Sequence, residues 1–443
     1  MFRPTIFFAV LGLLICTSLI SSKKPDPNPI DPSFNYVEVN KVNKTAINLP
    51  YPGEFYTGYI TVNQTSGSKI HYQLYSAGGN KRASTINDTA PFILSLSGGP
   101  GCPGGNSYYE TGPFRVTLVN GTTFVPVLND VTWNDEYHLL YVDNPVGVGY
   151  SVVADDMPAF ALANGAYLVN FLKRFFELYP NLKKQDFYIQ GESYGGHFVL
   201  GLATQLLANP QLGIQFKGVG MQAGWFDPKF QSTGWADGLY AAGVLDLRTR
   251  VQMNSMADQF RGYIASQDYA AAYNLTDKIE ALIPKGLGFA DYRNNTEWDP
   301  ATIAWLNLPS TKGYLAADPK TNWQCLSLGP WFHLDFPQSY AQNVTYMLNN
   351  YNISFLVYQG QNDFKVPSAG TKHSLNNLKW TGIAGYLAAP NKVWKDTDSN
   401  VIGQYKHYGK LTYATVNKGG HNVAHDQPWS VKNLIDRWIK GTW

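Results

Sequence analysis

Gly191-Glu192-Ser193-Tyr194-Gly195 is the stretch of sequence that decides the fold. The apolar run Asp186–Gln190 precedes it, and the helix-like run His197–Ala208 follows it. A strand that reverses through a tight turn into a helix holds its apex residue in a strained conformation, and small neighbours make room for that residue. Ser193 then lies at the N-terminus of a helix, where backbone amides stabilise an anion. The pattern predicts a nucleophilic serine; the alternative is a glycine-rich turn with a solvated serine.

The composition favours a folded enzyme over a disordered or nucleic-acid-binding protein. Hydrophobic residues make up 44% and aromatic residues 14% of the 443 positions, which is ample for a large core. Only 15% of the residues are charged, which argues against disorder. The formal net charge is +2 and there is no basic run, so we expect neither nucleic acid nor an anionic membrane surface as a partner.

Residues 1–22 are typical of a secretory signal peptide. Arg3 gives the N-terminal region a positive charge, Ile6–Cys16 forms the apolar core, and Thr17–Ser22 offers small residues for cleavage. The apolar core is shorter than the roughly 18 to 20 residues that a membrane span needs. We therefore expect entry into the secretory pathway and no membrane attachment after cleavage. A lysosome, a vacuole and the extracellular space all remain open as destinations.

The cysteines and glycosylation sequons agree with an oxidising compartment. Removal of the signal peptide leaves Cys102 and Cys325, which most simply form one disulfide. Asparagine followed by x-Ser/Thr predicts N-glycans at several positions, which are Asn43, Asn63, Asn87, Asn120, Asn274, Asn294, Asn343 and Asn352.

Apolar runs alternate with helical patterns along the chain, which indicates a mostly parallel sheet flanked by helices on both faces. The expected helices outside the middle of the chain are 159–179, 197–208 and 429–439. The expected strands are Tyr56–Val62, Lys69–Ser76, Phe92–Leu96, Tyr137–Val142, Asp186–Gln190, Phe216–Met221, Ser354–Tyr358 and Thr412–Val416.

The middle of the chain, at about 229–335, has a different character. Helices are expected there at Trp235–Val244, Arg248–Ser266 and Asp277–Ile283, and the remainder is rich in Asn and Pro. Because the sheet pattern resumes afterwards, we interpret this region as a largely helical insertion, or cap. Residues 23–443 then form a single α/β domain.

A nucleophilic serine needs a base to take its proton and a carboxylate to orient that base. In this type of fold the chain order is Ser, then Asp or Glu, then His, each after a strand. Asp363 follows the strand Ser354–Tyr358, and His421 follows the strand Thr412–Val416. Position alone does not exclude other candidates, which are His425, Asp426 and Asp143.

Neither metal nor nucleotide chemistry is favoured by the sequence, and we expect no cofactor. His421 and His425 have a spacing seen in metal sites, but the preceding Gly-Gly suggests a loop rather than a helix. The loop Gly98-Gly99-Pro100-Gly101 lacks the lysine and serine of a phosphate-binding loop.

Five motifs, taken together and in this order, resemble the serine carboxypeptidase family of α/β-hydrolases. The resemblance spans nearly the whole mature chain and implies a catalytic triad of Ser193, Asp363 and His421. The motifs are Ser97-Gly98-Gly99-Pro100-Gly101-Cys102, Asp143-Asn144-Pro145-Val146-Gly147, Gly191-Glu192-Ser193-Tyr194-Gly195-Gly196-His197, Gly360-Gln361-Asn362-Asp363 and Gly419-Gly420-His421-Asn422-Val423.

The resemblance also implies how a substrate is held. The backbone N–H groups of Gly99 and Tyr194 correspond to the family's oxyanion hole. Ser97, Gly98, Glu110 and Glu192 correspond to the site that binds the terminal carboxylate of a peptide. Two carboxyl groups in contact cannot both ionise cheaply, so one keeps its proton and can donate a hydrogen bond to that carboxylate. We therefore expect a preference for mildly acidic pH.

The sequence departs from the family beside this carboxylate site. Ser97 stands where the family usually has Asn, and Ser95 stands where it usually has Trp. The spacing from Cys102 to Glu110 is also shorter than is usual in the family. These changes put strict selectivity for free C-termini in doubt but leave the triad intact.

The sequence therefore predicts a serine-type carboxypeptidase that releases C-terminal residues from peptides through an acyl-enzyme. The main alternative is an acyltransferase or esterase on the same scaffold, and a further alternative is a catalytically silent binding protein.

Overall fold

The computed structural model describes residues 26–79, 82–284 and 300–443. The predicted signal peptide and the sequon at Asn294 therefore lie outside the described residues. Within the described ranges, no helix has the length and apolar character needed to cross a membrane.

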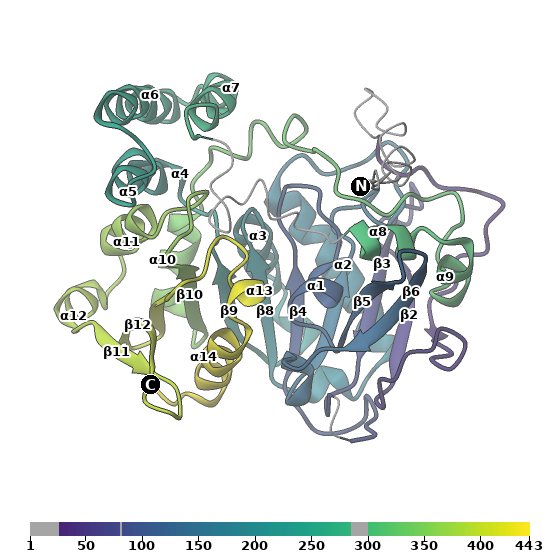
Figure 1. The fold of residues 1–443 in the computed structure, drawn as a ribbon. Coiled ribbons are helices and arrows are strands. Elements are labelled where there is room, and N and C mark those ends of the chain that lie inside the picture. The colour runs from purple at the N-terminus through teal and green to yellow at the C-terminus, as the bar shows by residue number, and fades with distance from the viewer. Residues whose placement is uncertain (1–25, 80–81, 285–299) are drawn as a thin grey trace, which may run out of the picture.

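An eleven-stranded sheet runs through the molecule in the order β1-β2-β3-β7-β4-β8-β9-β10-β13-β12-β11 (Figure 1). The central strands from β7 to β13 run parallel to one another, whereas the pairs toward both edges, beginning with β3–β7 and β13–β12, are antiparallel. The predicted mostly parallel sheet is thus confirmed, and with its antiparallel edges the whole sheet is mixed. The strands are β1 (Asn40–Lys41), β2 (Phe55–Thr61), β3 (Lys69–Tyr75), β4 (Phe92–Leu96), β7 (His138–Val142), β8 (Phe187–Glu192), β9 (Phe216–Gln222), β10 (Ser354–Gly360), β11 (Lys392–Lys395), β12 (Val401–Tyr408) and β13 (Leu411–Val416).

Helices cover both faces of this sheet, as the period-two pattern of its strands requires. Phe92 and Leu94 of β4 pack into the core that contains α2 and α3, whereas Ile93 packs into the core on the α14 side. Figure 1 shows α2 and α3 behind the strands and α14 in front of them. The α-helices are α1 (Asn106–Tyr109), α2 (Ala161–Leu178), α3 (Gly195–Leu207), α4 (Pro228–Gln231), α5 (Trp235–Ala241), α6 (Leu247–Ala265), α7 (Tyr269–Glu280), α8 (Pro300–Leu306), α9 (Pro309–Tyr314), α10 (Ala341–Asn350), α11 (Ser368–Asn377), α12 (Ile383–Ala388), α13 (Val423–Asp426) and α14 (Pro428–Lys440).

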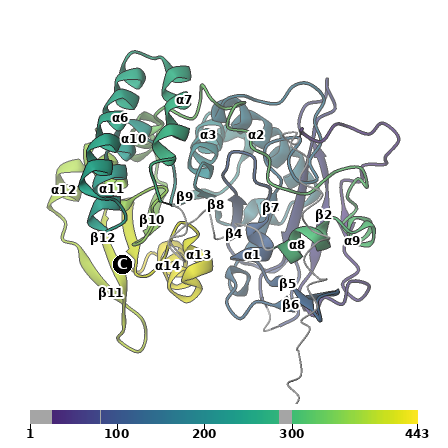
Figure 2. The same ribbon diagram turned by 45° about the horizontal axis from the view of Figure 1, so that its top comes forward.

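The helical region between β9 and β10 begins with α4 and continues to α9. Figure 1 places α5, α6 and α7 together near α11, and Figure 2 shows α6 and α7 running side by side. The expected helix at 277–283 is wrong in its bounds, because α7 is Tyr269–Glu280. Its start is fixed by Asp268, whose side chain accepts a hydrogen bond from the amide of Ala271 at 3.0 Å.

A hairpin and a disulfide complete the architecture near the loop after β4. The hairpin pairs β5 (Phe114–Val119) with β6 (Thr123–Leu128) and was not among the expected strands. The predicted disulfide is confirmed: Cys102 and Cys325 are bonded across 223 positions of sequence. It ties the loop after β4 to the segment that precedes β10. The amide of Leu326 also donates to the carbonyl oxygen of Gly101 at 2.8 Å, which reinforces this connection.

Candidate active site

Ser193 sits at the apex of the turn between β8 and α3, as the sequence predicts. Its φ is +55°, a conformation that non-glycine residues rarely adopt. A Cβ added to Gly191 would lie 2.3 Å from the carbonyl oxygen of Gly195, so the turn leaves no space for a side chain there. The Ser193 amide donates to the Gln222 carbonyl at 2.9 Å, and the Trp225 amide donates to the Ser193 carbonyl at 2.8 Å. The strained turn is therefore held in place by the strand-end loop of β9.

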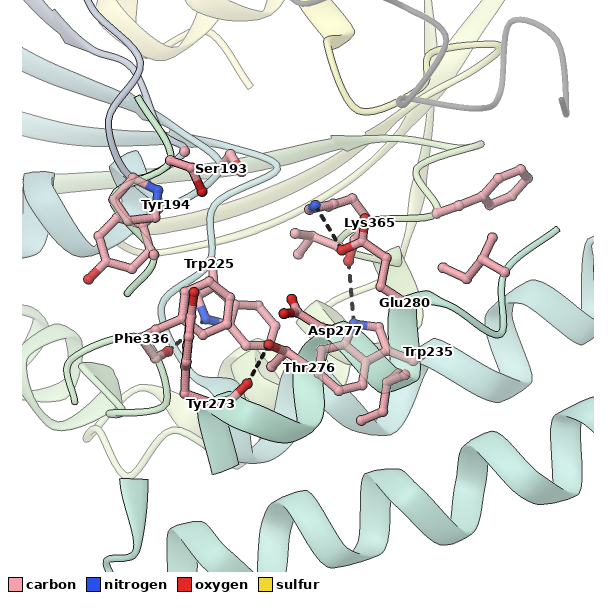
Figure 3. Close-up of a pocket in the computed structure, with 18 of the residues that line it drawn as sticks. Ser193, Tyr194, Trp225, Trp235, Tyr273, Thr276, Asp277, Glu280, Phe336 and Lys365 are labelled. Atoms are coloured by element: carbon pink, nitrogen blue, oxygen red, sulfur yellow. Dashed lines mark hydrogen bonds and ion pairs between the residues drawn. The ribbon is translucent and has the colours of Figure 1, made fainter. Parts of the chain in front are cut away.

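The glycine-rich loop after β4 closes against this turn. A Cβ on Gly98 would lie 2.8 Å from both the Ser193 Cβ and the Tyr194 nitrogen, so glycine permits the close approach. Gly99, Ser193 and Tyr194 line one cavity of about 340 Å³. Figure 3 shows Ser193 at one edge of this cavity with its hydroxyl turned toward it. The two residues expected to supply oxyanion-hole amides thus lie at the same cavity as the serine.

Tyr194 is fixed by its side chain as well as by the turn. Its hydroxyl donates to Oδ2 of Asp335 at 2.5 Å, and the hydroxyl of Tyr340 donates to Oδ1 of the same carboxylate at 2.8 Å. The Tyr194 ring also stacks on His197, with the ring centroids 4.7 Å apart. These buried contacts anchor the residue whose amide is expected to stabilise the oxyanion.

His421 and Asp363 are in direct contact. Nδ1 of His421 lies 3.1 Å from each carboxylate oxygen of Asp363, and both side chains are buried. Asp363 also accepts hydrogen bonds from the amides of Lys365 and Val366, both at 2.9 Å, which fixes the orientation of the carboxylate. The imidazole is thus held through one nitrogen, as the base of a catalytic triad must be.

The loops that carry these two residues pack closely on each other. A Cβ on Gly360, at the end of β10, would lie 2.2 Å from the carbonyl oxygens of Gly419 and Gly420. The Gly420 amide donates to Asp426 at 2.6 Å, which positions the chain just before His421. Glycine at these positions therefore allows the His421 loop to lie against the Asp363 loop.

A side-chain hydrogen bond joins the Ser193 turn to the His421 loop. Asn422, the residue after His421, donates to Oε1 of Glu192, the residue before Ser193, at 3.0 Å. The same amide donates to Oε1 of Glu110 at 3.2 Å. We call Glu110, Glu192 and Asn422 the carboxyl cluster. It links the two parts of the predicted triad that lie farthest apart in the sequence.

The carboxyl cluster is densely hydrogen-bonded. Gln222 donates to Oε2 of Glu110 at 3.1 Å, and Asn106 donates to Oε2 of Glu192 at 2.7 Å. The two carboxyls are each about 95% buried and share the amide of Asn422. Burial is the main cause that raises the pKa of Glu110 above its usual 4.5, whereas its hydrogen bonds to Gln222 and Asn422 oppose that shift. Glu110 and Glu192 therefore lie close enough in a buried environment to accept hydrogen bonds from the same amide group.

Asn106, Gln222 and Asn422 are the site residues that the sequence analysis missed. Asn106 accepts a hydrogen bond from Ser97 at 3.0 Å, so an amide side chain lies beside the position where the family usually carries one. Asn422 directly follows His421 in a motif that was quoted for the histidine alone. Its place in that motif could have indicated a role in the site. The sequence around Gln222, at the end of β9, and around Asn106, in α1, gave no such indication.

The rival residues occupy other positions. Asp143 is buried and accepts hydrogen bonds from the amides of Gly104 and Tyr150, at 2.9 and 2.8 Å, and burial raises its pKa to about 7. His425 stacks on Tyr109 with ring centroids 4.3 Å apart. Among residues 26–79, 82–284 and 300–443, no group of three or more His, Cys, Asp or Glu side chains is arranged to hold a metal ion.

The fold and the strained serine define an α/β-hydrolase. The crystal structure of Kex1(delta)p, described as a prohormone-processing carboxypeptidase from Saccharomyces cerevisiae, superposes with a TM-score of 0.78. It is 20% identical in sequence, and the match covers 91% of this chain and 96% of that one. At that identity the similarity establishes the fold alone.

The sequence itself establishes the family. A model of the serine carboxypeptidase family matches residues 46–441, so the chain belongs to the serine carboxypeptidase family of hydrolases. The chain is 29% identical to the probable serine carboxypeptidase CPVL of Homo sapiens, over 92% of this chain and 88% of the relative. It is 30% identical to the venom serine carboxypeptidase of Apis mellifera, over 86% of this chain and 84% of the relative. Membership in a carboxypeptidase family implies peptide substrates, and the Cys102–Cys325 disulfide is consistent with the secretory pathway.

Proposed function

We propose that this protein is a serine-type carboxypeptidase that releases C-terminal residues from peptides through an acyl-enzyme intermediate. The observation that carries the proposal is the connected set of contacts around Ser193. His421 is hydrogen-bonded to Asp363. Asn422, in the His421 loop, donates a hydrogen bond to Glu192, the residue before Ser193. Strain at Ser193 and the cavity in front of it support the same assignment.

In the proposed mechanism Ser193 attacks the carbonyl carbon of the last peptide bond. His421 accepts the hydroxyl proton and then donates it to the leaving amine, whose C–N bond breaks as the acyl-enzyme forms. Water repeats the sequence: His421 takes a proton from it, the resulting hydroxide attacks the ester, and the proton returns to Ser193. Asp363 orients the imidazole and stabilises its cationic form throughout.

The negative charge on the tetrahedral intermediate is assigned to the amides of Gly99 and Tyr194. Both residues line the cavity with Ser193, which supports this assignment. Loss of one such donor typically costs about 3 kcal/mol of transition-state stabilisation. The anchoring of Tyr194 by Asp335 keeps its amide in a fixed direction, so little reorganisation is needed during the reaction.

Recognition of the peptide's free carboxylate is assigned to Ser97, Gly98 and the carboxyl cluster. A protonated Glu110 can donate a hydrogen bond to that carboxylate, whereas two ionised glutamates would repel it. The raised pKa of Glu110 extends the range over which this proton is present. As pH rises through that pKa the proton is lost, so activity toward free acids should decline on the alkaline side. Activity is therefore expected to be highest at mildly acidic pH.

Asn106 bears on the choice between peptidase and acyltransferase. Its amide lies at 3.0 Å from the Ser97 hydroxyl and 2.7 Å from Glu192, and so offers a polar group near the position vacated by the family's usual Asn. This favours retained recognition of free C-termini. The Cys102–Cys325 disulfide is consistent with the secretory pathway. We therefore propose that the mature enzyme acts in an acidic lysosome or vacuole or outside the cell.

A paired assay tests the proposed function. An N-blocked dipeptide with a free C-terminus is compared with its C-terminal amide from pH 4 to pH 8, and kcat/KM is measured for each. We expect the free acid to be hydrolysed much faster, with an advantage that shrinks as pH rises. Equal rates on the acid and the amide at every pH would exclude recognition of the terminal carboxylate by the carboxyl cluster.

A further inference from the structure

The cavity in front of Ser193 extends into the helical region and has an aromatic wall. We call it the aromatic pocket, and the rings that form the wall considered below are those of Trp225, Trp235, Tyr273 and Phe336 (Figure 3). Its volume of about 340 Å³ lies within the roughly 300 to 1,000 Å³ of typical ligand pockets. None of the described residues that line it belongs to the carboxyl cluster. A peptide whose terminal carboxylate lies at that cluster would thus direct its penultimate side chain, on the acyl side of the scissile bond, into this pocket.

The tryptophan rings form a rigid apolar surface. Trp225 and Trp235 stack with centroids 5.7 Å apart and planes 10° apart, and Phe336 lies 5.5 Å from Trp225. The Trp225 indole donates to the Phe336 carbonyl at 2.9 Å, and the Trp235 indole donates to the Lys365 carbonyl at 3.3 Å. Because both indole N–H groups are engaged by backbone, the rings are fixed, and the wall suits the methylene stem of a long side chain.

The charges at this pocket do not balance. Among the described residues that line it, the acidic and basic side chains are those of Asp277, Glu280 and Lys365. Glu280 pairs with Lys365 at 3.3 Å, which neutralises both. Asp277 is exposed, and no ion pair is formed by it with any residue of the described chain. Figure 3 shows its carboxylate among the aromatic side chains while Glu280 is joined to Lys365. Among the described residues that line the pocket, one negative charge therefore remains over an apolar wall.

We propose that the aromatic pocket selects a basic penultimate residue, with arginine preferred, and that Asp277 is the specificity-determining residue. The inference rests on the proposed carboxypeptidase function. Arginine satisfies both features, because its stem packs on the tryptophans while its planar guanidinium pairs with a carboxylate and stacks on aromatic rings. Lysine offers the charge without the planar group. A neutral apolar residue uses only the wall, and a glutamate meets the unbalanced negative charge.

Substrates that differ only in charge give the sharpest test. N-blocked dipeptides share a C-terminal leucine and carry arginine, citrulline, leucine or glutamate at the penultimate position, and kcat/KM is measured for each. Citrulline has the shape of arginine without its charge. We expect arginine to exceed citrulline about fivefold, the upper range for a solvent-exposed ion pair, and glutamate to be the poorest substrate. An arginine-to-citrulline ratio of one or less overturns the inference.

Variants separate Asp277 from general charge effects. Asp277→Asn should bring the arginine-to-citrulline ratio to about one while leaving leucine turnover within about twofold. Asp258→Asn makes the same change of charge on α6, outside the pocket, and should keep the wild-type ratio. A ratio that Asp277→Asn does not change overturns the role of Asp277.

Binding distinguishes failure of this inference from failure of the proposed function. The same arginine and citrulline peptides are titrated calorimetrically into Ser193→Ala, with and without Asp277→Asn. A preference for arginine in binding that depends on Asp277, together with no hydrolysis of any dipeptide by the wild-type protein, would reject only the carboxypeptidase assignment. Hydrolysis of the leucine dipeptide without any arginine preference would reject only the selection of a basic side chain.

Discussion

Two regions beside Ser193 differ in how they hold charge. The carboxyl cluster buries Glu110 and Glu192 at 5% and 6% exposure and engages them with side-chain amides. The aromatic pocket instead leaves Asp277 exposed beside fixed indole rings. Burial makes the first region sensitive to protonation and costly to alter. Exposure makes the second region tolerant, so its charge can tune which side chain is accepted without disturbing the fold.

The proposed nucleophile, Ser193, lies beside both regions, and its removal should have the largest effect. Ser193→Ala should lower kcat by about 10⁶-fold, because no hydroxyl remains to form the acyl-enzyme. Labelling by a fluorophosphonate should disappear, while an unchanged melting temperature would show that the fold is intact. Both regions could then be studied by binding alone. Labelling that persists would show that the nucleophile lies elsewhere.

The protonation of the carboxyl cluster should be visible in the pH dependence of activity. Above the raised pKa of Glu110, wild-type kcat/KM on a free-acid peptide should fall about tenfold per pH unit, because the neutral acid is the form that binds. Glu110→Gln cannot ionise and still donates a hydrogen bond, so the alkaline decline should move to higher pH or vanish.

A charge-matched control separates this effect from the general loss of a carboxylate. Glu136→Gln removes an exposed carboxylate whose oxygen lies 4.0 Å from the amine of Lys440. The pH profile of this variant should match that of the wild type. The contribution of Glu110 is rejected if Glu110→Gln retains the wild-type alkaline decline on the free-acid peptide.

The amide beside Ser97 should have a smaller effect on selectivity. Asn106→Ala removes a hydrogen bond to Glu192, and we expect the acid-to-amide ratio of kcat/KM to fall about tenfold. Ser97→Ala removes only the hydroxyl that donates to Asn106 and should lower the ratio about twofold. An Asn106→Ala variant with an unchanged ratio would show that this amide takes no part in recognising the C-terminus. The roughly fivefold change expected at Asp277, described above, lies between these two effects.

The sequence alone determined the features that depend on neighbouring residues. The glycines around Ser193 encode the strained turn because no side chain fits beside it, and the apolar run Phe92–Leu96 has the bounds of β4 as expected. The count of two cysteines after the signal peptide was enough to predict the disulfide. Two local signals were overlooked: Asp268 caps α7, and Asn120-Gly121, both at positive φ, form the turn between β5 and β6.

Only the tertiary structure decided what surrounds the serine. The carboxyl cluster joins Glu110 just after α1, Glu192 at the end of β8 and Asn422 in the loop after β13. Asn106 of α1 reaches Glu192 across 86 positions of sequence. The pocket wall likewise combines Trp225 and Trp235 with Phe336. Such contacts depend on how helices and loops pack over the sheet, a long-range property that no local pattern encodes. The role proposed for Asp277 depends on packing for the same reason. The sequence shows that Asp277 is acidic, but only the packing determines that Lys365 pairs with Glu280 and not with Asp277.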